Sequence, residues 1–199
     1  KDAGDAASLA TQVWLYDSKA KMVASASVPA AVRALAFAGE RLVVGDATGS
    51  VRVFDGDELS AGPAVATLHE GGVLGLSVSS DGKTVASVGR DARLRLLDAS
   101  TLEAGAEAVV GIDSRSIAID PVLGWVAVGD GDGTIRALRL DAPQTLREMQ
   151  VGGGECGGVT TLAFTEDGRV IAGCGDGSVR FLHLEGEPDE ELRSGDFGH

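Results

Sequence analysis

The sequence is poor in aromatic side chains, which make up 4% of its 199 residues. A core built from this chain must therefore consist mostly of Val, Leu, Ile and Ala. Long apolar runs are also missing: none approaches the roughly 18 residues of a membrane-spanning helix, so we expect no membrane partner. The hydrophobic content of 44% still favours a folded domain over a disordered chain.

Cysteine is scarce as well, with Cys156 in a glycine-rich stretch and Cys174 in a β-prone run. There is no CxxC spacing and no nearby His, so the two residues predict no zinc site. A disulfide between them stays open, but we interpret Cys156 as a loop thiol and Cys174 as a small buried hydrophobe. Free thiols favour a reducing compartment. We therefore expect an intracellular protein, cytoplasmic or in an organelle-associated complex.

Positive charge is in short supply, with 17 Lys and Arg against 30 Asp and Glu, a net charge of −13. Because nucleic-acid binding depends on Lys and Arg neutralising phosphates, a nucleic-acid partner is unlikely on this balance. The simplest role of the negative charge is solubility, and the alternative is attraction of a basic partner.

What the sequence does contain is a repeat. Four similar segments begin at residues 32, 73, 114 and 159, which lie 41, 41 and 45 residues apart by subtraction. Each segment opens with a β-prone run such as Val32–Phe37 and closes with another such as Ser50–Asp55. A period of roughly 40–45 residues built of short strands is typical of propeller blades.

The second repeat shows the strand pattern most clearly. Its β-prone runs are 64–68, 73–79, 84–88 and 93–97, separated by turns that include Ser80-Asp81-Gly82-Lys83. An Asp-Gly pair between β-prone runs is a strong hairpin signal. Four short antiparallel strands form a sheet with two apolar faces, which is buried only by stacking on neighbouring sheets. The one helical turn that we expect lies near residues 142–148.

The predicted fold class is therefore all-β, a β-propeller of four-stranded antiparallel blades with about four full repeats plus a partial N-terminal one. The predicted units are 1–17, a blade remnant; 18–185, four repeats at about 21–55, 62–98, 107–140 and 146–184; and 186–199, an acidic C-terminal tail. Residues 11–17 look like the last strand of an earlier repeat, and the last repeat ends at its third strand. We expect a fragment of a larger propeller, or a half-ring completed by another chain or segment, because open sheet edges invite aggregation.

These residues resemble the WD-repeat (tryptophan–aspartate) β-propeller family, over about residues 11 to 185. The terminal Trp-Asp pair of the family is represented by Tyr16-Asp17, Phe54-Asp55 and Leu97-Asp98, and the Gly-His site by Leu68-His69. The family's turn Asp is matched by Asp91, Asp132 and Asp176, with Thr48 in the first full repeat. In this family the outer strand of the last blade usually comes from the N-terminus.

The resemblance implies a buried hydrogen-bond network in the second repeat, formed by His69, Ser87 and Asp91. Asp91 would accept a hydrogen bond from the His69 ring, and His69 would contact Ser87. The same three residue types form hydrolytic triads, but the sequence has no Gly-x-Ser-x-Gly elbow. We therefore expect a structural network and no catalytic residues.

Other features have simpler interpretations than binding sites. Gly129–Gly133 lacks the ligand spacing of a calcium loop, and Gly152–Gly154 lacks the ending of a phosphate loop. His183 and His199 have no metal partners at useful spacing, so we expect no metal and no cofactor. Trp125 is interpreted as core or rim, with a binding anchor as the alternative. Four Arg recur at one position of the last strand of each repeat and are interpreted as a solvated stripe paired with acidic residues, or else as a ladder touching a partner: Arg52, Arg95, Arg136 and Arg180.

The resemblance implies a non-enzymatic scaffold for protein–protein interaction, a propeller subunit of a larger multiprotein assembly. By resemblance, the usual contact surface is the face that carries the turn Asp residues. The candidate contacts there are Glu70, Arg90, Asp113 and Arg115. The alternatives are an enzyme-type propeller that depends on quinone or metal, and a nucleic-acid-binding propeller; a repeated ligand set for the first is missing from the sequence.

Overall fold

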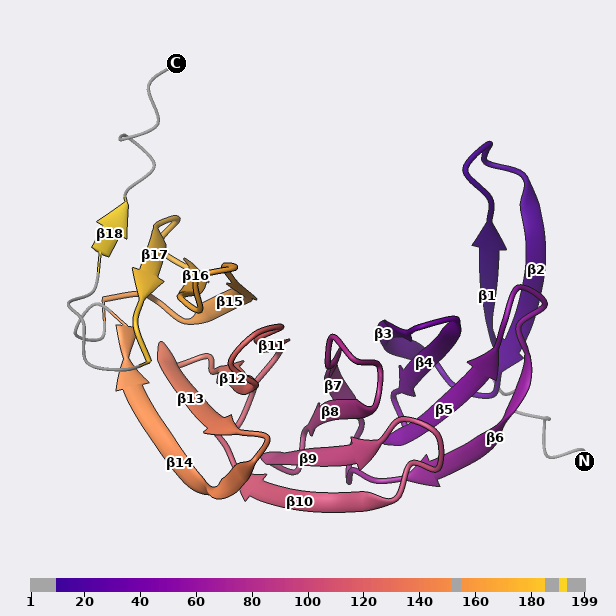
Figure 1. Cartoon of the computed structure of the whole chain (residues 1–199), viewed down its shortest axis with the longest axis horizontal. Coiled ribbons are helices and arrows are strands. Elements are labelled where there is room, and N and C mark those ends of the chain that lie inside the picture. Colours follow the sequence, from indigo (N-terminus) through magenta and orange to yellow (C-terminus); the bar gives the residue numbers. More distant parts are fainter. Residues whose placement is uncertain (1–9, 152–154, 185–189, 193–199) are drawn as a thin grey trace, which may run out of the picture.

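The computed structural model describes residues 10–151, 155–184 and 190–192. This part of the chain folds into 18 β-strands grouped in five antiparallel sheets, which follow one another along an open arc (Figure 1). The innermost strand of each complete sheet lies on the concave side of the arc. No helix in the described part is long and apolar enough to cross a membrane.

Four of the sheets have four strands each, in the order of the sequence from the concave side outward. The first blade contains β3 (Val32–Ala38), β4 (Arg41–Asp46), β5 (Ser50–Asp55) and β6 (Ser60–Thr67). The second contains β7 (Val73–Val78), β8 (Thr84–Gly89), β9 (Arg93–Asp98) and β10 (Ala104–Val109). The third contains β11 (Ser116–Ile119), β12 (Trp125–Gly129), β13 (Thr134–Arg139) and β14 (Ala142–Gln150). The fourth contains β15 (Val159–Phe164), β16 (Val170–Cys174), β17 (Val179–Leu182) and β18 (Glu190–Leu192). The fifth sheet is a two-stranded hairpin before the first blade, with β1 (Thr11–Tyr16) and β2 (Met22–Val28).

Tight turns make these short strands possible. Gly82, in the predicted Asp-Gly turn, has φ +70°, a conformation that glycine adopts without steric cost. Gly49, between β4 and β5, has φ +90°, and a Cβ there would lie 1.7 Å from the His69 carbonyl oxygen. Glycine at position 49 therefore lets the loop before the second blade pack against the first blade.

The sheets are offset by one strand from the sequence repeats. The run at 64–68, read as the start of the second repeat, falls largely in β6 and pairs with β5 of the first blade. The last blade also differs from expectation: its fourth strand, β18, comes from residues placed in the acidic tail, and not from the N-terminus. β18 joins the edge of β17 through main-chain ladder bonds.

The helical turn expected near residues 142–148 is wrong, because these residues lie in β14. Leu146 and Met149 are three residues apart and therefore point to opposite faces of the strand. Leu146 packs with the cluster between the second and third blades, and Met149 with the cluster between the third and fourth blades. An outer strand that packs into the clusters on both of its faces thus has apolar residues at a spacing that is also typical of a helix.

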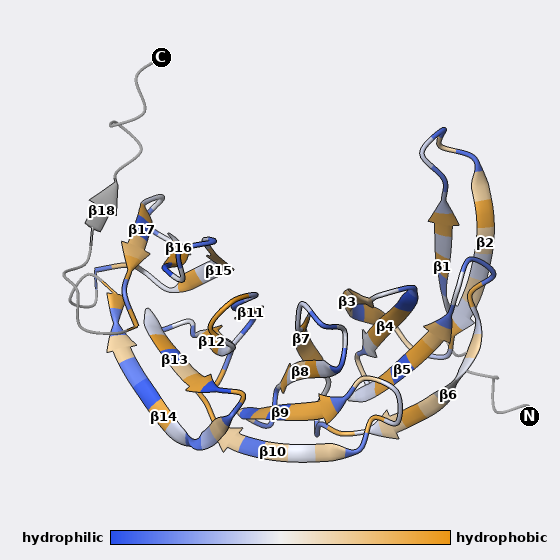
Figure 2. Ribbon diagram, viewed as in Figure 1, coloured by the Kyte–Doolittle hydropathy of each residue, from blue (hydrophilic) through white to orange (hydrophobic). Residues whose placement is uncertain are grey.

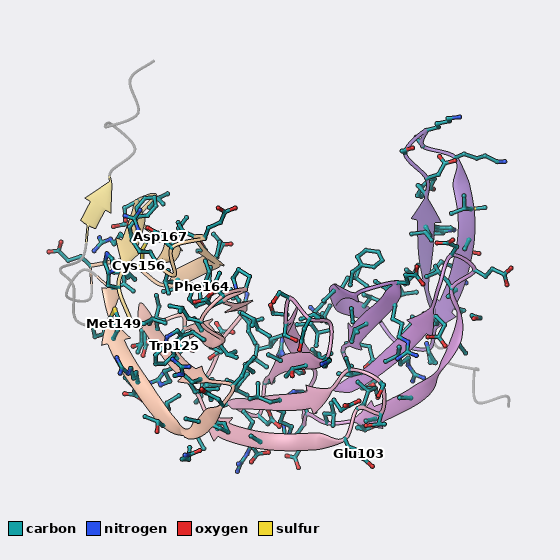
Figure 3. All side chains as sticks on the ribbon, in the orientation of Figure 1. Glu103, Trp125, Met149, Cys156, Phe164 and Asp167 are labelled. Carbon is teal, nitrogen blue, oxygen red and sulfur yellow. A yellow bond between two sulfur atoms is a disulfide. The ribbon has the colours of Figure 1, made fainter. Side chains whose placement is uncertain are left out.

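The core lies between blades, in four clusters made mostly of Val, Leu, Ile and Ala, as the composition predicts. Figure 2 shows this as apolar strands joined by hydrophilic turns. Trp125 is 2% exposed, which agrees with the interpretation as core. Figure 3 shows it inside the blades near Met149, whereas Glu103 points away from the arc. The guanidinium groups of Arg139 and Arg147 lie 5.8 and 5.0 Å from its ring centroid.

Candidate functional site

The loops that carry the predicted contact residues form one continuous surface, which we call the loop face. It consists of the turns after the second strand of each blade and the connections between blades: residues 47–49, 68–72, 90–92, 110–115, 130–133, 155–158 and 175–177. Backbone hydrogen bonds join neighbouring loops, for example from Arg90 N to Gly72 O at 3.0 Å and from Gly175 N to Gly158 O at 2.8 Å. The loop face is therefore held in place by main-chain bonds.

The four candidate contact residues are all exposed on the loop face. Glu70 and Arg90 belong to loops of the second blade that touch, since a Cβ at Gly71 would lie 3.4 Å from Arg90 Cβ. Asp113 and Arg115 lie in the next interblade loop and pair with each other, with Arg115 Nη2 donating to Asp113 Oδ1 at 2.7 Å. The structure thus gathers these residues on three neighbouring loops, and their role in binding stays a prediction.

Beneath the loop face, each complete blade holds an Arg of its third strand against an Asp. The pairs are Arg52–Asp46, Arg95–Asp91, Arg136–Asp130 and Arg180–Asp176. The pairing with acidic residues agrees with the sequence interpretation, but the solvated stripe is wrong. The Arg180 side chain is 3% exposed, and the other three are mostly buried. The alternation of side chains along the strand did not predict the burial of these arginines, because the connection between neighbouring blades covers the end of the strand.

In the second blade, the structure brings His69, Ser87 and Asp91 together. His69 Nδ1 lies 2.9 Å from Asp91 Oδ1, and His69 Nε2 lies 2.8 Å from Ser87 Oγ. A neutral ring satisfies both contacts when Nδ1–H donates to the carboxylate and the Ser87 hydroxyl donates to Nε2. Arg95 Nη1 donates to Asp91 Oδ2 at 2.8 Å and closes the network.

The electrostatics of this network keep the imidazole neutral and the carboxylate charged. Burial lowers the pKa of His69 below its ordinary value, and the nearby Asp91 only partly opposes that shift. Burial would raise the pKa of Asp91, but hydrogen bonds from Arg95 and His69 outweigh it and hold that pKa below its usual range. The network therefore consists of the neutral His69 ring, which donates one hydrogen bond and accepts another, beside the Asp91–Arg95 ion pair.

In the third blade, the buried carboxylate is Asp130 and not the family's turn position, Asp132. Asp130 is fully buried, accepts hydrogen bonds from Ser114 Oγ and Arg136 Nη1, and its backbone oxygen accepts from Val159 N at 2.9 Å. Asp132 is exposed and accepts a hydrogen bond only from the backbone of Thr134 among the contacts described for its side chain, at 3.0 Å.

The first blade follows the same alternative plan. Asp46 is 1% exposed and lies 3.7 Å from Arg52, while Thr48, at the family's turn position, donates its hydroxyl to Asp46. Sequence reasoning missed Asp46 and Asp130, which stand two residues before the expected position. A signal was present: both begin the pattern Asp-x-x-x-Ser/Thr-x-Arg, in 46–52 and 130–136.

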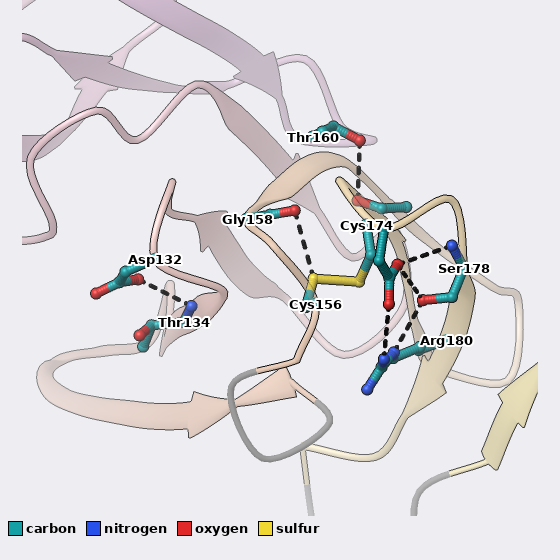
Figure 4. Close-up of a disulfide and its surroundings, with 10 residues drawn as sticks. Asp132, Thr134, Cys156, Gly158, Thr160, Cys174, Ser178 and Arg180 are labelled. Carbon is teal, nitrogen blue, oxygen red and sulfur yellow. Dashed lines mark hydrogen bonds and ion pairs between the residues drawn. A yellow bond between two sulfur atoms is a disulfide. The ribbon is translucent and has the colours of Figure 1, made fainter.

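The interpretation of the two cysteines as free thiols is wrong, because Cys156 and Cys174 form a disulfide (Figure 4). The Gly-rich connection returns to the start of β15, and Val159 pairs with Cys174 across β15 and β16. This brings the two Cα atoms to 5.1 Å, within the range that a disulfide needs. The bond also removes the reason for expecting a reducing compartment.

The hydrogen-bond network of the second blade lies below the surface. Ser87 is fully buried, so a substrate has no access to its hydroxyl. Within the described residues, no group of three or more His, Cys, Asp or Glu is placed to hold a metal ion. A hollow of about 270 Å³ opens at the concave side, lined by inner-strand residues that include Leu74, Thr160 and the base of the loop face at Arg115.

Comparison with known families gives two matches. The cytochrome D1 heme domain matches residues 41–133, and the WD domain, G-beta repeat, matches residues 146–182. No curated protein sequence matches the chain.

Solved structures show the same architecture. A chain in the crystal structure of a mitotic checkpoint complex is similar with a TM-score of 0.80 and 18% identity, covering 91% of this chain and 57% of that one. The computationally designed Ika4 protein is similar with a TM-score of 0.68 and 24% identity, covering 82% of this chain and 98% of that one. At these identities the likeness is one of fold, and the chain spans little more than half of the first neighbour.

The residues of the heme-domain match do not fit a haem. Haem iron is held by His, Cys, Met or Tyr, and residues 41–133 contain one of these, His69. Both of its ring nitrogens are engaged, by Asp91 and Ser87, and the ring is buried. Residues 41–133 therefore offer no free ligand for haem iron.

The four-stranded blades and the structural neighbours lead to one conclusion: the chain has a β-propeller fold, with a match to the WD domain, G-beta repeat, at residues 146–182.

Proposed function

We propose that the chain is a non-enzymatic scaffold for protein–protein interaction, a propeller subunit of a larger multiprotein assembly that holds a partner on the loop face. The observation that carries this proposal is the continuous loop face itself, with four exposed charged side chains on loops fixed by main-chain hydrogen bonds. WD-repeat propellers are in general interaction scaffolds. A rigid frame with variable loops concentrates specificity in those loops.

The recurring arginines support a protein partner over a nucleic acid. All four are paired with carboxylates, of which those of Asp46, Asp91 and Asp130 are buried or partly buried, so the arginines are not free to neutralise phosphates. The net charge of −13 acts in the same direction. The loop face offers both signs of charge, in Glu70 and Asp113 and in Arg90 and Arg115, which suits a polar protein surface with mixed charge.

Partner capture by surface variants tests the proposal. The chain is tagged and used to purify partners from its source cells, which mass spectrometry identifies, and cell fractionation in the same material tests the expected intracellular location. The test variant reverses the charges of Arg90 and Arg115 to Glu. The control is Lys83→Glu, a charge reversal at a side chain that is 81% exposed in the turn between β7 and β8, at the other end of these strands.

We expect the native chain and Lys83→Glu to recover the same partner, and the double variant to lose it by about tenfold, which corresponds to about 1.4 kcal/mol. Thermal unfolding must show that all three proteins are folded. Equal recovery by the double variant would overturn the assignment of the loop face, and turnover of a substrate by the purified chain would overturn the non-enzymatic assignment.

A further inference from the structure

Two hollows lie side by side at the end of the blades that faces away from the loop face. The first, of about 620 Å³, lies between the first and second blades, and its lining includes Glu40 and Arg41. The second, of about 400 Å³, lies between the second and third blades, and its lining includes Leu140. Lys83, in the turn before β8, and Asp98, at the end of β9, border both hollows. The two hollows therefore form one groove across the second blade, which we call the outer groove.

The second hollow is lined mostly by apolar side chains. Leu96 and Ala106 come from the second blade, and Leu140 and Pro143 from the third, whose outer strand β14 follows β10 along the outer side of the arc (Figure 1). Gly105 adds no side chain, and a Cβ there would meet only the Leu96 carbonyl oxygen, at 3.6 Å. This hollow suits an apolar side chain of a ligand, and a larger residue at position 105 would fill it.

The first hollow is bordered by charged side chains, and the cations among them are already near carboxylates. Arg41 Nε lies 2.9 Å from Asp55 Oδ1. Lys83 Nζ lies 4.0 Å from Asp81 Oδ2, and its side chain is 81% exposed. Glu40 is exposed and forms no ion pair with any of the described residues. The first hollow thus presents a carboxylate that still lacks a cation.

Asp98 is a second such carboxylate, held in place by its own turn. Its Oδ1 accepts hydrogen bonds from Ser100 N at 2.8 Å and from Thr101 N at 3.0 Å. Hydrogen bonds from Ser100 and Thr101 lower the pKa of Asp98 to about 2, so the carboxylate is charged at neutral pH. Its Oδ2 accepts none of the hydrogen bonds described for this side chain, so one oxygen is left for a ligand.

Carboxylates outnumber cations in all the turns around the outer groove. Residues 39–41, 55–60, 79–83 and 98–103 contain seven carboxylates and two cations: Glu40, Asp55, Asp57, Glu58, Asp81, Asp98 and Glu103, with Arg41 and Lys83. In the part of the chain that the structure describes, no three such groups converge to hold a metal ion. Charge spread in this way complements an extended basic segment better than a single ion.

The other occupants that could be considered fit this charge less well. Among the residues outside the described part, the only cations of the sequence are Lys1 and Arg193. A second copy of the chain carries the same net charge of −13 and is repelled. Nucleic acids and anionic membrane surfaces are repelled for the same reason. Charge complementarity therefore favours a basic segment of another protein.

We propose that the outer groove binds an extended segment of another protein in which basic residues stand near an apolar one. An Arg or Lys of the segment lies in the first hollow against Glu40 and Asp98, and the apolar side chain enters the second hollow beside Leu140. The outer groove lies at the opposite end of the blades from the loop face, so it is a second interaction site beyond the proposed function.

Labelled peptides test the outer groove directly. Capped peptides carry an Arg pair and a Leu joined by glycine linkers of increasing length, in both orders, and fluorescence anisotropy follows their binding to the full chain. Matched peptides replace the Arg pair by a Glu pair, or the Leu by Ala. The test variant, Glu40→Gln with Asp98→Asn, removes both charges and keeps the shape of the side chains. The control, Glu166→Gln with Asp167→Asn, makes the same change of charge in the turn between β15 and β16 of the fourth blade.

We expect the native chain to bind the peptides that carry Arg and Leu, with an affinity that falls as salt screens the charges. The variant Glu40→Gln with Asp98→Asn should bind about tenfold more weakly, and the fourth-blade control should bind as the native chain does. Lys83→Glu should bind more tightly, because it removes the opposing cation. Gly105→Leu should bind the Leu and Ala peptides equally, because its side chain fills the second hollow. Thermal unfolding shows whether each variant is folded.

The inference fails if no peptide binds at the highest soluble concentration, if the test variant and the fourth-blade control lose the same affinity, or if the Arg and Glu peptides bind equally. Self-association of the native chain that Gly105→Leu abolishes would assign the outer groove to a second copy and also overturn the inference. Reversing Arg90 and Arg115 to Glu should affect capture on the loop face but not peptide binding. Glu40→Gln with Asp98→Asn should do the reverse, so this site and the proposed function can fail separately.

Discussion

The second and third blades solve the same packing problem with opposite choices of residue size. In the second blade the interblade loop supplies a large residue, His69, and the strand end opposite it is Gly89, where a Cβ would lie 2.3 Å from the imidazole. In the third blade the strand end supplies Asp130, and the loop residue beside it is Gly111, where a Cβ would lie 2.3 Å from the carboxylate. One side of each contact must be glycine, because the space holds a single polar side chain.

The fold fixes where a side-chain contact connects the interblade loop to the end of the second strand, but it does not fix which residues make that contact. Both blades connect the interblade loop to the end of the second strand, through His69 to Ser87 in one and through Ser114 to Asp130 in the other. In both, an Arg of the third strand neutralises the carboxylate. Such a contact matters because it holds the loop face in a fixed position on the blade beneath it.

Removing Asp130 is expected to have the largest effect on stability. Asp130→Ala removes the fully buried carboxylate from the mostly buried guanidinium of Arg136, which keeps only the exposed Glu148, and leaves Ser114 with the Gly111 carbonyl as its acceptor. Removing one partner of a buried pair costs about 4 kcal/mol of unfolding free energy. Chemical denaturation of the native chain and the variant measures the loss.

Asp132→Ala is the matched control, because it removes a carboxylate from the same turn. Asp132 is exposed and its side chain accepts a backbone hydrogen bond from Thr134, so the expected loss is about 1 kcal/mol. If the two variants lose the same stability, the buried position is not the one that holds the third blade together.

The fold was predictable from the sequence because period and turn chemistry are local signals. The repeat spacing of about 41 residues and turns such as Asp81-Gly82 predict the blades, and the four-stranded sheets are observed. Which strands share a sheet was not predictable from the repeat alone. A repeat has no marked beginning, so β6 could be read with either neighbour until its pairing with β5 was seen.

The site was predictable only where it followed the family pattern. His69, Ser87 and Asp91 stand at family positions and meet in the structure. Asp130 serves the same purpose from two residues earlier, and its role depends on Gly111, which is distant in sequence. A pattern read along one repeat does not contain that contact.

The fourth blade extends the comparison, because there a covalent bond joins the interblade loop to the end of the second strand. Cys156 of the interblade loop is joined to Cys174 at the end of β16, 18 residues apart in sequence. Closing a loop of this length stabilises a fold by about 3 kcal/mol, chiefly by restricting the unfolded chain. The variant Cys156→Ser with Cys174→Ser should lose this amount in chemical denaturation.

Reduction of the native chain by dithiothreitol gives an independent measure of the same bond. We expect the reduced native chain to unfold close to the midpoint of the double variant, and the double variant itself to be insensitive to the reductant. A native chain whose denaturation midpoint does not move on reduction would show that the fourth blade is held by Asp176 and Arg180 and not by the disulfide.

The second blade should differ from the others in its response to pH, with the smallest effect of the three. Burial lowers the pKa of His69 in the folded state below its ordinary value of 6.5. The unfolded chain therefore binds the proton more readily, so stability is fully present above about pH 6.5 and falls as the pH drops below it. Denaturation midpoints measured from pH 8 to pH 5 follow this change.

His69→Gln removes the titrating group while keeping a side chain that can hydrogen-bond. We expect this variant to be less stable at pH 8, because glutamine does not reproduce both contacts to Ser87 and Asp91, and to lose less stability between pH 8 and pH 5 than the native chain. The corresponding contacts of the third blade, from Ser114 and Arg136 to Asp130, include no histidine, so Asp130→Ala should keep the native pH response. If His69→Gln and Asp130→Ala show the same pH response, the imidazole is not the group that titrates. The second blade would then not differ from the third in having a neutral His69 contact in place of the charged Asp130 contact.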